Sequence, residues 1–274
     1  MGRKIIAADL QAAEIRIFAH YSGDERLQAV FPRGEDIYSR VAIDVYNRPD
    51  LSAHPDDSNF LKKVEPQLRQ DVKAFTLGVV YGSTGFQVAA NLNLFDSKGR
   101  VDSAAGQKLI DKYLSTYPNL RRYMLKQELA FKKQGYVQTP FGRIRRFDEA
   151  HSLYKKYGDK ILDSRWSKQN GLEIERGKVK KAMNAAKNFP IQSSTSSIIN
   201  RSIIEFGQWI EESKIDVKIL LTVHDENVVE CDEEDVELVC EKLKYCMENN
   251  KFSKMISVPL VATPIVGNNL AETK

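Results

Sequence analysis

Three polar residues, His224, Asp225 and Glu226, interrupt a run of β-branched and apolar residues in the last quarter of the chain. Apolar stretches precede them at 220–223 and follow them at 227–230, a pattern that predicts a β-hairpin with the polar residues at its turn. Asp is common in solvated turns, so an ordinary turn is one interpretation. The other is that rigid strands hold the Asp225 carboxylate in position to bind a metal ion.

A second carboxylate, Asp9, ends the apolar stretch 4–9, which predicts a short buried strand followed by a helix that stops at Gly23. A sheet that joins this strand to the hairpin would place Asp9 beside Asp225. Two adjacent carboxylates repel each other unless a cation lies between them. Oxygen ligands without a His or Cys cluster favour Mg²⁺, which proteins hold through one or two carboxylates and substrate phosphates.

A third group of residues lies on the helix that the pattern predicts over 66–81. Four side chains spaced by four residues form a slowly drifting stripe on it: Arg69, Lys73, Leu77 and Tyr81. The two cations could hold a triphosphate, and the tyrosine at the helix end could stack on a base. A solvated basic face with a core tyrosine is the alternative interpretation.

The composition is that of a soluble globular protein. The chain has 274 residues, of which 42% are hydrophobic and 28% charged, and it has no apolar run of membrane-spanning length. No signal peptide begins the chain, so we expect a cytoplasmic protein without a membrane partner, in the host cytoplasm if a phage encodes it. Three cysteines without C-x-x-C spacing indicate free thiols. The net charge is +4, with basic groups concentrated at 142–146 and 175–181, a weak indication of phosphate binding.

The remaining pattern predicts an α+β fold with a helical insertion between the strands that carry the two carboxylates. Pro190 predicts a break or a start within the helical region that follows 183, and Asp232 is a suitable N-cap for a helix after the hairpin. The polar segment 148–181 predicts an inserted surface subdomain. Further helices are expected at 34–47, 104–117 and 119–135, a hairpin at 135–147 and a last strand at 257–267.

The motifs together resemble a known family. The stretches DLQAAEIRIFAHYSGDERL, RQDVKAFTLGVVYG and VHDENVVE resemble, in order and spacing, the three polymerase motifs of family A DNA polymerases, the DNA polymerase I type. Further similarity lies in FPRGEDIYSRVA, LSTYPNLRRYM, GYVQTPFGRIRRF and NFPIQSSTSSIIN. The resemblance covers nearly the whole chain apart from residues 148–181.

This resemblance implies a right-hand polymerase fold, with an antiparallel palm sheet and an inserted helical fingers subdomain. Residues 1–27 and 190–274 would form the palm, and 28–189 the fingers, with 148–181 as an inserted basic segment. The thumb and the exonuclease of such enzymes have no counterpart in the chain. We therefore expect a split, phage-like polymerase, in which a separate chain supplies the thumb and the N-terminal palm, with or without an exonuclease.

The resemblance also implies the site residues of a two-metal nucleotidyl transfer, in which a dNMP is added to a primer 3′-hydroxyl. Asp9, Asp225 and Glu226 would be catalytic, and Asp9, the Leu10 carbonyl and Asp225 would bind two Mg²⁺ ions, which Mn²⁺ can replace. The expected dNTP-binding residues are Arg69, Lys73, Leu77, Tyr81, Glu14, Tyr38 and Gln11, with Glu14 excluding a ribose 2′-hydroxyl. The expected primer-template contacts are His224, Gln192, Arg143, Asn188 and Tyr81.

Two positions depart from the family pattern. Leu77 stands where the family usually has Phe or Tyr, and Tyr38 stands where a His commonly contacts the triphosphate. Two other functions are alternatives: a single-subunit RNA polymerase, against which Glu14 argues, and a noncatalytic DNA-binding subunit. A binding module needs no paired metal ligands, so Asp9 and Asp225 argue against the second alternative.

Overall fold

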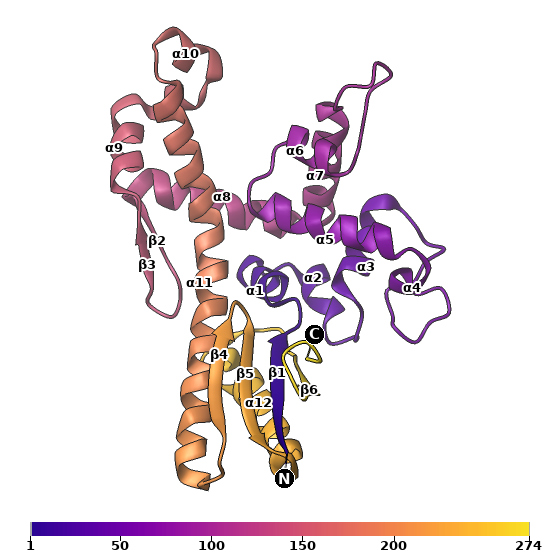
Figure 1. The fold of residues 1–274 in the computed structure, drawn as a ribbon. Helices are drawn as coiled ribbons and strands as arrows, with labels where there is room; N and C mark the ends of the chain where they lie inside the picture. Colours follow the sequence, from indigo (N-terminus) through magenta and orange to yellow (C-terminus); the bar gives the residue numbers. More distant parts are fainter. Residues whose placement is uncertain (1, 274) are drawn as a thin grey trace. The chain divides into compact units, whose positions relative to one another are not determined.

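The computed structural model describes residues 2–273 and divides into two compact units. The sheet unit comprises residues 2–20 and 191–273, and the helical unit comprises Tyr21–Pro190. All described strands except one short hairpin belong to the sheet unit (Figure 1). The predicted α+β fold, with a helical insertion in an antiparallel sheet, is therefore confirmed.

The sheet unit contains a four-stranded antiparallel sheet in the order β4-β5-β1-β6. Its strands are β1 (Arg3–Leu10), β4 (Lys218–Val223), β5 (Glu226–Asp232) and β6 (Ala262–Gly267). Figure 1 shows β5 between β4 and β1. The three consecutive residues 6–8 of β1 are all buried, as expected of an inner strand that is covered on both faces. The predicted hairpin is present, but its turn contains only His224 and Asp225, because Glu226 already pairs as the first residue of β5.

The helix after the hairpin, α12 (Val236–Asn249), begins later than the sequence predicts. Asp232 is the last residue of β5, and a single 3₁₀ turn, η2 (Glu233–Asp235), separates it from the helix. The reason is strand pairing: the backbone of Asp232 lies opposite Arg3, whose guanidinium also contacts the Asp232 and Glu230 carboxylates at 3.2 and 2.5 Å. Val239, Leu243, Cys246 and Met247 form the buried face of α12. A further 3₁₀ turn, η3 (Ser253–Met255), precedes β6.

The prediction of a helix break at Pro190 is wrong. Helix α11 runs without interruption from Glu173 to Ser213, with Pro190 inside it. An internal proline removes one helical hydrogen bond and costs roughly 3 kcal/mol in an isolated helix. Burial of apolar side chains before and after the proline, among them Ala186, Ile191 and Ile198, offsets this cost. The boundary between the two units falls at this proline.

The helical unit includes the end of α1 (Ala13–Ser22) and a series of helices that pack around buried tyrosines. Tyr113 and Tyr117 are fully buried, and the ring of Tyr113 contacts those of Phe75 and Tyr117 edge-on, with centroids 5.5 Å apart in both pairs. Helices α2, α4 and α6 were not predicted. The helices are α2 (Glu25–Val30), α3 (Ile37–Tyr46), α4 (Leu61–Val64), α5 (Pro66–Val80), α6 (Gly85–Asn91), α7 (Ser103–Thr116) and α8 (Pro118–Gln134).

The last part of the helical unit forms around a core of its own. A hairpin of β2 (Tyr136–Gln138) and β3 (Ile144–Arg146) is followed by α9 (Asp148–Tyr157), η1 (Gly158–Leu162), α10 (Ser164–Gln169) and the start of α11. This core contains Phe131, Val137, Phe147, Ala150, Ile161, Val179, Ala182, Met183 and Ala186. Segment 148–181 is thus folded on its neighbours rather than extended. Of the helices in residues 2–273, none combines the length and the apolar character needed to span a membrane.

Candidate active site

The register of the sheet brings the two predicted metal ligands to the same place. Asp9 lies directly opposite Glu226 on the β1–β5 ladder, and the Leu10 N–H donates a hydrogen bond to the Asp225 carbonyl at 3.2 Å. Asp9 is exposed, whereas Asp225 and Glu226 are half-buried. Acidic residues of β1 and of the β4–β5 hairpin, more than two hundred positions apart in sequence, therefore share one end of the sheet.

The charges at this end of the sheet favour a cation. Within residues 2–273 the structure records no ion pair for Asp225 or Glu226, so their negative charge is not compensated by a neighbouring side chain. Among the described residues there is no group of three or more His, Cys, Asp or Glu side chains that could hold a metal without further ligands. Carboxylate and carbonyl oxygens completed by phosphate oxygens suit Mg²⁺. The donor set thus fits the metal, and ligation by these residues remains a prediction.

A buried polar network positions the hairpin. Asn227, which follows the acidic residues on β5, is completely buried. Its amide nitrogen donates to Ser202 Oγ of α11 at 2.9 Å, and its amide oxygen accepts from Thr222 Oγ1 of β4 at 2.9 Å. Ser202 in turn donates to the Ile199 carbonyl at 2.8 Å. Sequence reasoning did not single out Asn227, although a polar residue directly before the buried valines of a strand is a usable signal.

The turn after β1 holds other predicted site residues. The Gln11 N–H donates to the Val261 carbonyl at 2.9 Å, and its side chain donates to Thr263 Oγ1 at 2.5 Å. Ala12 adopts a left-handed conformation, with φ 51°, which redirects the chain into α1. Glu14 is half-buried in the first turn of that helix. The predicted DNA contacts of this unit, Gln192 on α11 and His224 at the turn, are both exposed.

In the helical unit, Arg69 on α5 is held by an ion pair. Its Nε and Nη2 groups donate to the two oxygens of Asp36 at 2.9 and 2.7 Å. Asp36 is the N-cap of α3 and also accepts from the Ser39 N–H at 2.9 Å. Burial alone would raise the pKa of Asp36, but the Arg69 guanidinium and the Ser39 donors hold that pKa below its usual value. Arg69 is therefore fixed in one orientation by an ionised partner.

Tyr38 lies beneath both predicted triphosphate-binding cations. The residue is 4% exposed, and the Arg69 guanidinium and the Lys73 ammonium lie 5.3 Å and 5.9 Å from the centroid of its ring. Both distances are within cation–π range. Lys73 itself is exposed. Tyr38 thus orders the two basic side chains of the stripe.

The other predicted residues of the helical unit lie around the ends of elements. Leu77 is half-buried on α5, and Tyr81, also half-buried, is its C-cap. Arg143 is exposed beside the β2–β3 turn. Asn188 on α11 is half-buried, and its side-chain oxygen finds no hydrogen-bond partner among the described residues. The predicted metal ligands and the predicted triphosphate ligands therefore belong to different units.

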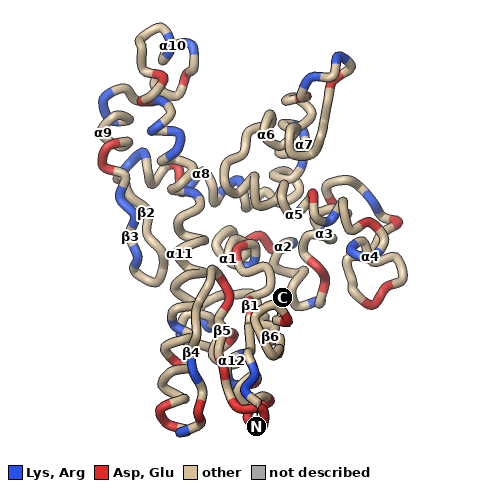
Figure 2. The backbone as a smooth tube through the Cα atoms, viewed as in Figure 1, with Lys and Arg blue, Asp and Glu red and all other residues tan. Residues whose placement is uncertain are grey.

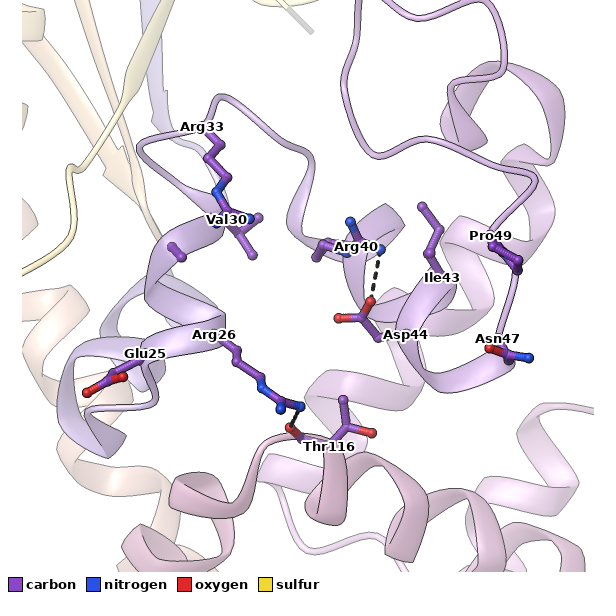
Figure 3. Close-up of a pocket in the computed structure, with 11 residues that line it drawn as sticks. Glu25, Arg26, Val30, Arg33, Arg40, Ile43, Asp44, Asn47, Pro49 and Thr116 are labelled. Carbon is purple, nitrogen blue, oxygen red and sulfur yellow. Dashed lines mark hydrogen bonds and ion pairs between the residues drawn. The ribbon is translucent and has the colours of Figure 1, made fainter.

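A polar pocket of about 820 Å³ lies elsewhere in the helical unit, lined by residues of α2, α3 and the end of α7 (Figure 3). Arg40 and Asp44 form an ion pair at 2.9 Å on one side of it, and Arg26 donates to the Thr116 carbonyl at 3.4 Å. None of the residues predicted from the sequence lines this pocket. Of the three arginines that line it, Arg26, Arg33 and Arg40, the described residues record ion pairs for Arg40, with Glu35 and Asp44.

Comparisons with known proteins identify the family of the chain. The family model described as DNA polymerase family A matches residues 1–272. DNA polymerase I of Pseudomonas aeruginosa is 30% identical over 272 residues, and that of Caldicellulosiruptor bescii is 31% identical over 276 residues. These matches cover 99% and 100% of this chain but 25% and 27% of the relatives, so the chain spans about a quarter of their length.

A solved structure extends the similarity to three dimensions. The POL domain of Pol1 from M. smegmatis, in complex with DNA primer-template and dNTP, superimposes with a TM-score of 0.78 at 27% sequence identity. The similarity covers 98% of this chain and 40% of that one. The predicted polymerase fold is therefore confirmed. With the family model matching residues 1–272, the chain belongs to DNA polymerase family A.

Proposed function

We propose that this chain catalyses template-directed DNA synthesis, in which a dNMP is transferred to a primer 3′-hydroxyl. The observation that carries the proposal is the β1–β5 register, which sets Asp9 opposite Glu226 and bonds Leu10 to Asp225. Membership of DNA polymerase family A supports DNA polymerase over the single-subunit RNA polymerase alternative. The described residues record no ion pair for Asp225 or Glu226, which disfavours a purely structural subunit, since clustered negative charge is unfavourable without a cation.

The sheet unit would carry the chemistry. Asp9, the Leu10 carbonyl and Asp225 would hold two Mg²⁺ ions, with Glu226 as a further acid beside them. When bound, the ions supply an activated 3′-hydroxyl and neutralise charge on the triphosphate. Asn227 keeps the hairpin, and with it Asp225, in a fixed position relative to α11. The protein's own contribution at this site is therefore preorganisation of oxygen ligands.

The helical unit would bind the incoming nucleotide. An arginine has five N–H donors, and Asp36 uses one on Nε and one on Nη2 of Arg69, so further donors remain for phosphate oxygens. Lys73 would add a second positive charge, and Tyr81 a stacking surface. From the sheet unit, Gln11 and Glu14 would contact the sugar side of the nucleotide, where Glu14 selects deoxyribose. His224, Gln192, Arg143 and Asn188 would contact primer and template.

A separate polypeptide, supplying a thumb and the N-terminal part of a palm, would complete the enzyme. Support for such a partner comes from β4, the edge strand of the sheet, in which every residue is exposed. Ile219, Leu220, Leu221 and Val223 are 36–45% exposed. Exposed apolar edge strands are normally covered or blunted by charges. We infer that this edge is a surface for the partner.

Substitution of the metal ligands tests the proposal. Asp225→Asn and Asp9→Asn keep the size of the side chain and remove its charge, so we expect primer extension with Mg²⁺ or Mn²⁺ to fall by at least about 100-fold without loss of folding. Glu234→Gln is the matched control, because Glu234 is exposed in η2 of the same unit and should leave turnover unchanged. Near-normal turnover in either aspartate variant would refute the assignment.

A further inference from the structure

The positive charge of the protein is concentrated in one segment. Residues 142–181 contain twelve Lys or Arg and six Asp or Glu, a net charge of +6, although the whole chain carries only +4. The remaining residues are therefore slightly acidic overall. Figure 2 shows Lys and Arg along β3 and around α9 and α10. About half of this charge lies in 148–181, the segment without counterpart in the family motifs.

These basic groups stand on one folded support. The root of the β2–β3 hairpin, α9, η1 and the start of α11 all contribute to the same core, through Val137, Phe147, Ile161 and Val179 among others. The hairpin arginines and the basic residues of 148–181 are therefore held on a common framework. Rigid presentation lowers the entropy lost when such a surface binds a ligand.

Most of the basic side chains of segment 148–181 form no ion pair with the described residues. Of the nine Lys or Arg in 148–181, the described structure records an ion pair for Lys178 alone, with Glu149. The acids of the segment serve other contacts: Asp163 caps α10 by accepting from the Trp166 N–H at 2.7 Å, and Asp159 accepts from Lys132 at 2.8 Å. The basic side chains without a recorded ion pair are Lys155, Lys156, Lys160, Arg165, Lys168, Arg176, Lys180 and Lys181.

Two further features of the segment indicate that its ligand is a polyanion that carries aromatic groups. Burial and the nearby Arg176 charge lower the pKa of Lys180, so like charges are held close together without compensation. Tyr157 and Trp166 form a half-buried ring pair, with centroids 6.0 Å apart, and the Lys156 ammonium lies 5.0 Å from the Tyr157 ring. Basic groups interleaved with aromatic rings are typical of surfaces that bind nucleic-acid strands.

We propose that segment 148–181 is an additional DNA-binding surface that contacts the phosphate backbone of a DNA strand. The segment shares its hydrophobic core with the β2–β3 hairpin, which carries Arg143, Arg145 and Arg146. Lys155 and Lys156 at the end of α9 and Arg165 and Lys168 on α10 provide its exposed charges. This inference rests on the proposed polymerase function, since it places the inserted segment on the path of primer or template.

The test compares two charge-matched quadruple variants of the full chain. The first is Lys155→Ala, Lys156→Ala, Arg165→Ala and Lys168→Ala. The control removes the same charge from exposed lysines of α4, the loop before α7, and α7, with Lys62→Ala, Lys98→Ala, Lys108→Ala and Lys112→Ala. Fluorescence anisotropy with a labelled single-stranded oligonucleotide and a labelled primer-template duplex, across a salt series, gives the affinity and its salt dependence.

We expect the first variant to lose about tenfold or more in affinity at low salt, for at least one of the two DNA probes. The slope of log K against log salt should fall by roughly 0.7–0.9 for each phosphate contact removed. The control variant should change the affinity and the slope by less than half as much as the first variant does. Restoring charge with Lys155→Arg and Lys156→Arg, on the Arg165 and Lys168 alanine background, should recover part of the affinity. The probe that is affected identifies the single strand or the duplex as the ligand.

Equal behaviour of the two quadruple variants on both probes would overturn the proposal. Circular dichroism melting of each variant shows whether the fold is kept, and the arginine variant tests the charge even if the alanines weaken the fold. The outcome is independent of catalysis, because binding is measured without dNTP. If Asp225→Asn keeps normal turnover while the first quadruple variant loses DNA affinity, the catalytic assignment fails and the DNA-binding surface stands.

Discussion

At the scale of single residues, Asn227 connects the acidic end of the sheet to the rest of the sheet unit. Its amide joins Ser202 of α11 to Thr222 of β4, and it is adjacent to Glu226, the partner of Asp9. Buried amides with both ends satisfied fix one arrangement, because any shift leaves a polar group without a partner. Residue types predict a metal-binding role for Asp9 and Asp225, whereas the residue that holds the hairpin depends on a helix that only the fold brings near.

Asn227→Ala therefore should affect both stability and activity. Loss of the amide removes its hydrogen bonds to the Ser202 and Thr222 hydroxyls and opens a small cavity, so we expect a loss of about 1–3 kcal/mol in the free energy of unfolding. Turnover should fall more than dNTP KM rises, because the hairpin that carries Asp225 loses its support. Urea denaturation and primer extension measure the two effects. Asn200→Ala, at an exposed position of α11, is the control. Equal effects of the two substitutions would argue against a positioning role for Asn227.

At the scale of elements, local signals located most helices but not all of their ends. Pro66 and Gly135 mark the start of α5 and the end of α8 as predicted, and Gly135 has the expected left-handed conformation, with φ 72°. The helix start predicted at Asp232 and the helix break predicted at Pro190 are wrong. Strand pairing with Arg3 outweighs the local preference at Asp232, and burial on both sides of the proline outweighs it at Pro190. Helix α6 has a complete capping box, formed by Thr84 and Gln87, and was within reach of sequence reasoning.

Gly82, just after α5, illustrates a position where any other residue is strained. Its φ is +80°, and a Cβ atom there would lie 2.5 Å from the Asn184 side chain of α11. We expect Gly82→Ala to lower the free energy of unfolding by about 1–3 kcal/mol, through backbone strain and displacement of Asn184. Gly177→Ala is the control with the opposite sign: Gly177 lies inside α11 in open space, so alanine should stabilise the helix by roughly 0.5–1 kcal/mol. Thermal unfolding followed by circular dichroism distinguishes the two, and stabilisation by both would contradict the steric argument.

At the scale of the whole molecule, the sequence predicts the family and the helical insertion because ordered motifs define both. It does not predict that Arg69 is held by Asp36 or that Tyr38 lies under two cations, since these contacts join α3 to α5. The chain spans about a quarter of the DNA polymerase I relatives, and the assembly in which it works is therefore a proposal. The physical feature that bears on this assembly is the uncovered edge of the sheet.

The edge strand β4 yields a prediction about the isolated chain. Its register with β5 shifts between Ile219 and Leu221, so Leu220 stands at the irregularity, and it is 42% exposed. An apolar edge that normally faces a partner should pair with another copy when the partner is absent. We expect concentration-dependent self-association of the purified chain by size-exclusion chromatography with light scattering. Leu220→Lys with Val223→Lys should reduce it, because charges on an edge strand oppose edge-to-edge pairing.

Leu238→Lys is the matched control, since Leu238 on α12 is exposed to a similar degree, 48%, but lies away from the strand edge. It should leave self-association unchanged, and if it reduces association as much as the β4 variants, general hydrophobicity rather than the strand edge is responsible. A chain that stays monomeric at high concentration and copies long templates alone would show that the edge needs no cover. The partner proposal would then fail, while the assignment of Asp9 and Asp225 would be unaffected, because it depends on the β1–β5 register alone.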